Sequence, residues 1–235
     1  MKDQAKVSEP KVWLARVGGD LKFQKPILAT PFQKDVRAGL PREKLELSLQ
    51  RAKDLYDTYR SGIPLTPDVL ETEFSLLPKR PKPAGPPVVM GLGGFIVVTA
   101  EARAFLESLD PGPMLFHPIN VANTARTAPL WDGAELFIVQ FLEVRRETII
   151  DQSGALSKKP VAGTCPDGAG RHLIGSTDGP DPIVVLPPME DGAEIWMDDR
   201  VENSIFMSDR VAQAIKTAKM SRAWGLLPCR VVHVN

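Results

Sequence analysis

Two runs of consecutive apolar residues, each ending at a hydroxyl residue, stand out along the chain. Three apolar residues precede Thr99, and three others precede Ser208. Beyond each hydroxyl residue, apolar residues recur three, six, seven and ten positions on, which is a helical spacing. They are Ala102, Phe105, Leu106 and Leu109 in the first unit, and Val211, Ala214, Ile215 and Ala218 in the second. A threonine or serine placed so can cap a helix by accepting a hydrogen bond from its first turn.

The pattern therefore predicts two strand–cap–helix units. Glu101 and Asp209 add negative charge where the helix dipole favours it. The likeness between the units is either an internal repeat or a coincidence between two amphipathic helices. Under both interpretations these residues are scaffold.

An amphipathic pattern also covers residues 41–60. Leu45, Leu49, Ala52, Leu55 and Tyr59 share one face at helical spacing, and the proline that opens the stretch suits a first helical turn. A Ser-Gly pair ends it. We expect a helix whose apolar stripe is covered by another part of the molecule.

Shorter patterns predict strands and hairpins elsewhere. Residues 11–17 and 114–121 favour strands, and the tail 224–235 alternates like a final strand. Asp132-Gly133 predicts a hairpin between "APLW" and "AELFIVQFLEV". Residues 190–192 predict a second one between "PIVVLPP" and "AEIWMDD", whereas residues 153–170 favour a loop.

These elements together predict a mixed α+β fold of short strands and hairpins with an N-terminal helical segment. We divide the chain into an N-terminal segment 1–77, a proline-rich connector 78–87 and an α+β core 88–235, packed as one compact unit. The stretch around the connector is rich in proline and basic residues, so it is either a stiff spacer or a ligand for an aromatic groove.

The charge balance narrows the classes of partner. Twenty-nine basic residues offset 29 acidic ones, so no overall field attracts nucleic acid or an anionic membrane. Two cysteines are too few for a disulfide framework, and the first residues lack the apolar core of a signal peptide. We expect a cytoplasmic protein that binds neither nucleic acid nor membrane.

Metal-ligating and nucleophilic residue types are present but poorly spaced for a site. His117, His172 and His233, with Cys165 and Cys229, lack the paired spacing of zinc ligands, so we expect no metal site. No nucleophile elbow occurs. An enzyme using a carboxylate or the loop of Cys165 and His172 stays open as an alternative, as does a small-molecule-binding or adaptor protein.

The strongest local charge lies in the stretch "MEDGAEIWMDDRVEN". It carries Glu190, Asp191, Glu194, Asp198, Asp199 and Glu202 against a single base, Arg200. We expect a solvated acidic rim around Trp196. Such a rim could attract a basic partner, because complementary charge accelerates encounter and an aromatic residue can anchor the contact.

From residue 61 onward the chain resembles the polymorphic-toxin immunity proteins of the Imm11 type. The resemblance rests on the order of "SGIPL", a proline-rich stretch, "FIVVTAEARAFLESLDPG", "FHPINV", "EIWMDD" and "SIFMSDRVAQAIKTAKM". The family's Trp-x-Asp motif maps onto Trp196 and Asp198, and its Phe-x-Ser-Asp motif onto Phe206, Ser208 and Asp209. Members often have an Ala-Gly turn after the last helix, whereas Lys219 stands here.

The resemblance implies a non-enzymatic protein without a cofactor that binds and neutralises a cognate protein toxin encoded nearby. It implies a role in bacterial competition, in which the producing cell is protected from its own secreted effector. The candidate contacts are the six carboxylates and Trp196 named above. Whether the protein is a monomer or a homodimer stays open.

Overall fold

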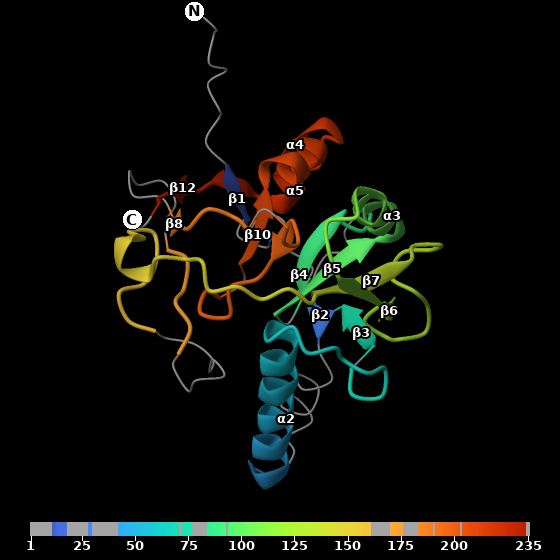
Figure 1. Ribbon diagram of the computed structural model, residues 1–235. Coiled ribbons are helices and arrows are strands. Elements are labelled where there is room, and N and C mark those ends of the chain that lie inside the picture. Colours follow the sequence, from blue (N-terminus) through green and yellow to red (C-terminus); the bar gives the residue numbers. More distant parts are fainter. Residues whose placement is uncertain are drawn as a thin grey trace, which may run out of the picture.

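The structure is a computed structural model that describes residues 11–17, 28–29, 42–70, 72–76, 84–92, 94–160, 170–175, 183–189, 191–202 and 204–233. Within these ranges helices and three sheets combine, which confirms the predicted mixed α+β class (Figure 1). None of the described helices has the length and apolar character that crossing a membrane requires.

A six-stranded sheet forms one half of the fold, in the order β2-β3-β6-β7-β5-β4. Its strands are β2 (Leu28–Ala29), β3 (Glu73–Leu76), β4 (Val89–Leu92), β5 (Phe95–Thr99), β6 (Met114–Ala122) and β7 (Leu136–Phe141). β3 and β6 run parallel, and the other neighbours are antiparallel.

A four-stranded antiparallel sheet in the order β11-β1-β10-β9 forms the other half. It comprises β1 (Val12–Ala15), β9 (Ile195–Trp196), β10 (Ile205–Ser208) and β11 (Leu226–Pro228), while β8 (Val184–Val185) and β12 (Arg230–Val231) form a parallel pair. Because β1 pairs with β10 and β3 with β6, strands from the segment 1–77 are built into both large sheets.

The two predicted strand–cap–helix units are confirmed. β5 leads into α3 (Ala100–Leu109), and β10 leads into α4 (Asp209–Thr217). The hydroxyl oxygens of Thr99 and Ser208 each accept the backbone N–H three residues on at 3.3 Å. Each unit is also preceded by an antiparallel strand, β4 or β9, so the shared plan extends to hairpin, cap and helix.

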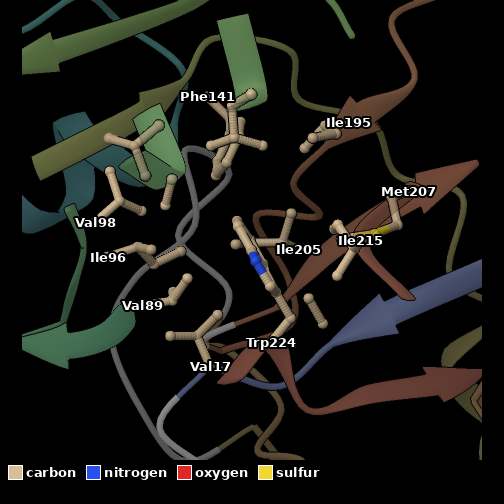
Figure 2. Packing of buried hydrophobic residues seen from close by; sticks show 14 of the residues in the cluster. Val17, Val89, Ile96, Val98, Phe141, Ile195, Ile205, Met207, Ile215 and Trp224 are labelled. Carbon is tan, nitrogen blue, oxygen red and sulfur yellow. The ribbon is translucent and has the colours of Figure 1, made fainter. Parts of the chain in front are cut away.

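The main core lies between the two sheets. Ile96 and Val98 of β5 and Ile205 and Met207 of β10 belong to one buried cluster, together with the inner faces of α3 and α4. Figure 2 shows Trp224, at the end of α5 (Ser221–Trp224), among side chains from both sheets. The caps thus direct both helices onto one shared core.

The opposite faces of the two sheets are buried as well. Val97 lies in a second cluster on the outer face of the six-stranded sheet, and Phe206 lies in a third on the far side of the four-stranded sheet. Strands covered on both faces need apolar residues at consecutive positions. This explains the unbroken apolar runs before Thr99 and Ser208.

The predicted helix is present as α2 (Arg42–Arg60), and its first turns extend away from both sheets (Figure 1). Tyr59 is buried in the second cluster, and Leu55 and Tyr56 pack against that cluster. Ala52 is exposed, so the expected cover of the apolar stripe is wrong at this residue. The side chains of Leu45 and Leu49 lie outside the described part of the structure.

Two predicted hairpins differ from the structure. The Asp-Gly turn exists, with Gly133 at φ +70°, but the partners of β7 are β6 and β5, and "APLW" contributes only a bridge between Ala122 and Pro129. The hairpin across residues 190–192 is wrong, because β8 pairs with β12 whereas β9 pairs with β10. Pro187 and Pro188 follow β8 and cannot donate to a ladder, which disfavours that hairpin.

The C-terminal segment forms two short strands instead of the single strand that the alternation predicted. β11 pairs with β1, and β12 pairs with β8. The chain changes sheets at Cys229, whose backbone N–H donates to the Val12 carbonyl. Residues 153–160 and 170 follow the predicted loop apart from a bridge at Leu156, and residues 161–169 lie outside the described ranges. Of the predicted connector, only residues 84–87 are described.

Candidate functional site

Trp196 of the acidic stretch lies inside the protein. Its side chain is 1% exposed and stacks on Phe206 with ring centroids 6.1 Å apart. The Arg145 guanidinium also lies over the Trp196 ring, 4.9 Å from its centroid. Trp196 is therefore part of the core of the four-stranded sheet, and it is not available as a surface anchor in this conformation.

Asp198 is fully buried and has hydrogen bonds to both carboxylate oxygens. Oδ1 accepts the backbone N–H and the Nε–H of Arg200, both at 3.0 Å. Oδ2 accepts from Arg200 Nη2 at 2.8 Å and from the Thr148 backbone N–H at 3.1 Å. A buried carboxylate needs such partners, since removal from water is costly without them.

Asp199 is paired in a similar way with a different arginine. The two guanidinium nitrogens of Arg146, Nε and Nη2, each donate to one carboxylate oxygen at 2.9 Å. The carboxylate side chain is 5% exposed, while that of Arg146 is 40% exposed. The negative charge of Asp199 thus faces an internal partner.

Arg60, the last residue of α2, holds the backbone of the same stretch. It is 1% exposed and donates to the carbonyls of Asp198 at 2.9 Å, Val201 at 2.7 Å and Ser204 at 3.2 Å. The Asp198 and Val201 carbonyls also accept locally, from the Val201 N–H and the Ser204 hydroxyl, so Arg60 adds a donor from a distant part of the chain. The end of α2 therefore fixes the turn between β9 and β10.

A second buried arginine, Arg171, joins α2 to the same turn. It donates to the Asp57 carboxylate at 2.7 Å and to the Asp199 carbonyl at 3.0 Å, and it lies over the Tyr56 ring. The Tyr56 hydroxyl donates to Glu202. Burial raises the pKa of the Tyr56 phenol well above its ordinary value, which keeps this hydroxyl a donor.

These contacts form one arginine–carboxylate cluster at the junction of α2 with the β9–β10 turn. Its charged members are Arg60, Arg146, Arg171 and Arg200 with Asp57, Asp198, Asp199 and Glu202. The four positive charges offset the four negative ones. The expectation of a solvated acidic rim is therefore wrong for Asp198 and Asp199, because charged groups removed from water require internal partners.

The rest of the acidic stretch lies nearer the surface. Asp191 is exposed, and Glu194 is partly exposed and pairs with Arg210 at the start of α4. Glu194 also accepts from the Ser208 hydroxyl at 2.8 Å, and Arg210 Nη2 donates to the Leu109 carbonyl at 2.9 Å. The Arg210 hydrogen bonds hold the pKa of Glu194 below its usual value. Glu190 lies outside the described residues.

The residues weighed for an enzyme or a metal site are scattered. His172 Nδ1 lies 2.6 Å from the Ser157 carbonyl, and Cys165 lies outside the described residues. Burial raises the pKa of the Cys229 thiol to about 12. In the described part of the chain, no three His, Cys, Asp or Glu side chains are grouped so as to hold a metal ion.

Sequence reasoning missed the arginines that contact the acidic stretch from distant parts of the chain. Arg60 and Arg171 lie 138 and 28 residues from the groups they contact at positions 198 and 199. No local periodicity marks such partners. The one available signal was the excess of carboxylates in a short stretch, which demands compensating charge from elsewhere in the chain once the stretch is buried.

No protein-family model matches this chain, and no curated protein matches its sequence. The resemblance to immunity proteins therefore rests on the order and residue types of the quoted motifs.

Proposed function

We propose that the protein is an immunity protein that binds a cognate bacterial toxin encoded nearby and neutralises it by covering its active surface. It acts in the cytoplasm of the producing cell, as a partner in protein–protein recognition and without a cofactor. The proposal applies the family resemblance to the described fold.

The observation that carries the proposal is the meeting of the segments on which the resemblance rests. Arg60, directly before "SGIPL", binds backbone carbonyls in the stretch that joins "EIWMDD" to "SIFMSD". Gln140 of β7 is fully buried and holds "SGIPL", since it accepts from the Leu65 N–H at 3.0 Å and donates to the Ile63 carbonyl at 2.6 Å. Because these segments contact one another at one junction, we expect proteins of this fold to contain all of them together.

The individual motif residues fit this framework role. Trp196 stacks on Phe206, Asp198 closes the β9–β10 turn, Ser208 caps α4, and Asp209 accepts from the Trp13 indole at 2.7 Å. A scaffold with fixed internal motifs can present variable outer residues to different toxins. Among the described candidate contacts, Asp191 is exposed, and Glu194 and Glu202 are partly exposed.

A growth assay tests the proposal. The C-terminal domain of the large protein encoded beside this gene is expressed alone and together with this protein, and growth is scored. The proposal expects arrest with the domain alone and growth with both. Continued arrest in cells that contain the folded protein would contradict it.

A matched pair of variants locates the contact. Asp191→Lys leaves the arginine–carboxylate cluster intact, so it should fold normally and weaken protection only if this surface meets the toxin. Asp198→Lys places a cation against Arg200 and should reduce folding first. Melting curves recorded beside the growth assay separate the two causes.

A further inference from the structure

A half-open pocket of about 280 Å³ lies where β3 and β6 run side by side, away from the arginine–carboxylate cluster. Ile119, Val121, Trp131 and Leu136 give it apolar walls, while Glu73 and Asn120 bring polar groups to its lining. Small-molecule sites usually span about 300 to 1,000 Å³, so this pocket suits a single side chain better than a drug-sized ligand.

Glu73 has a neutral hydrogen-bond partner, whereas the carboxylates of the acidic stretch that form ion pairs have arginine partners. It is exposed, and its Oε1 accepts from the Asn120 amide at 2.6 Å, a neutral group. Within the described part of the chain it forms no ion pair, whereas Asp198, Asp199 and Glu194 all do. Among the residues that the structure describes, Glu73 thus places a negative charge without an ion-pair partner beside an apolar hollow.

We propose that this pocket receives one arginine side chain of a partner protein; the inference rests on the proposed function, with the toxin as that partner. The aliphatic stem of arginine packs on apolar walls while its guanidinium reaches a carboxylate. Arginine is also among the residues that contribute most to binding when they occupy a pocket at an interface. A neutral apolar side chain in the pocket would give the Glu73 carboxylate no opposite charge to pair with.

The test uses the full chain and two small probes of nearly equal shape. n-Butylguanidinium carries the charged head of arginine, and n-butylurea is its neutral counterpart. Each is titrated while the Trp131 indole N–H and the backbone N–H groups of Val121 and Ala134 are followed by ¹H–¹⁵N NMR. We expect saturable shifts confined to the pocket, with n-butylguanidinium binding about threefold more tightly than n-butylurea.

Variants make the assignment specific. Glu73→Gln should remove the preference for the charged probe, whereas Glu101→Gln, at another exposed carboxylate, should leave it unchanged. Ala134→Leu should weaken both probes, because it adds volume to a lining residue. Equal affinity for the two probes, or absence of localised shifts, overturns the inference.

The outcome stays separate from that of the proposed function. Protection from the toxin that survives both Glu73→Gln and Ala134→Leu would show that the pocket is not where the partner's arginine binds, while the immunity role stands. If the protein binds n-butylguanidinium selectively but confers no protection, the pocket's preference for a guanidinium group is supported. The proposal that a toxin supplies that group is then rejected.

Discussion

The guanidinium of Arg60 donates to the backbone carbonyl of Asp198 at 2.9 Å, although 138 residues separate them in the chain. This contact joins the end of α2 to the turn between β9 and β10. The carboxylate of the same aspartate is bound by Arg200 and by the Thr148 N–H. The part of the acidic stretch around Asp198 and Asp199 is therefore an internal junction, and its carboxylates are bound within the fold.

Replacing Arg60 should destabilise the protein strongly. Arg60→Leu removes a buried guanidinium together with its hydrogen bonds to the carbonyls of Asp198, Val201 and Ser204. We expect a loss of about 3 kcal/mol in the free energy of unfolding, measured by urea denaturation. Arg51→Leu, at an exposed position of α2, is the control and should change it by less than about 0.5 kcal/mol. Equal effects of the two would refute the junction.

Asp198→Asn tests the buried carboxylate with little change in shape. The substitution removes the negative charge that pairs with Arg200. It also replaces one carboxylate oxygen by an N–H₂ group, which faces the N–H groups that donated to that oxygen. A cost of about 3 kcal/mol is expected in thermal or urea unfolding. Asp191→Asn, at an exposed position, should cost less than about 0.5 kcal/mol. A stable Asp198→Asn protein that fails to bind its partner would instead favour a direct contact.

Lys219 adopts a backbone conformation that favours glycine. Its φ is +59°, and the N–H groups of Lys219 and Met220 donate to the Lys216 and Ile215 carbonyls, as in a Schellman helix end. Lys219→Gly should raise the free energy of unfolding by about 0.5 to 1 kcal/mol, because it relieves the left-handed strain. Lys219→Ala keeps that strain, so a comparable gain with alanine would show that removal of the lysine side chain is responsible.

The pair of Glu194 and Arg210 predicts part of the acid sensitivity. Hydrogen bonds from Arg210 lower the pKa of Glu194 below 4.5 in the folded protein, so the unfolded chain takes up this proton first as the pH falls. The stabilisation is present above the unfolded pKa and is lost as the pH falls through the folded one. Unfolding free energies of the wild type and Glu194→Gln should therefore converge below about pH 4. In an Arg210→Gln background, Glu194→Gln should change the pH dependence of the unfolding free energy only slightly. A full effect in that background would show that a group other than Arg210 lowers the pKa of Glu194.

Local signals in the sequence predicted the local structure well. The hydroxyl residues Thr99 and Ser208 and the apolar spacing after them lie within a few residues of the groups they contact, so both units could be predicted. The choice of strand partners is a property of the whole chain. "APLW" and "PIVVLPP" have strand-like composition, yet the first folds back on β6 and the second pairs with the tail.

The candidate site shows the same division more sharply. The excess of carboxylates was visible in the sequence, but the solvated rim around Trp196 was inferred from composition alone, and Trp196 is buried. Charged residues are mostly exposed unless they are paired. Arg146, from the loop after β7, pairs with Asp199, and Arg60 of α2 binds the adjacent backbone carbonyl of Asp198. Only the folded arrangement brings those arginines together.

Direct measurement of association between the purified protein and the proposed toxin, the C-terminal domain of the large protein encoded beside it, tests the account most directly. Isothermal titration calorimetry should show a saturable complex, tight enough to survive size-exclusion chromatography, with Glu73→Gln weakening it more than Glu101→Gln does. Absence of both heat and complex with protein that melts cooperatively would contradict the claim that this fold acts by presenting a surface to a toxin.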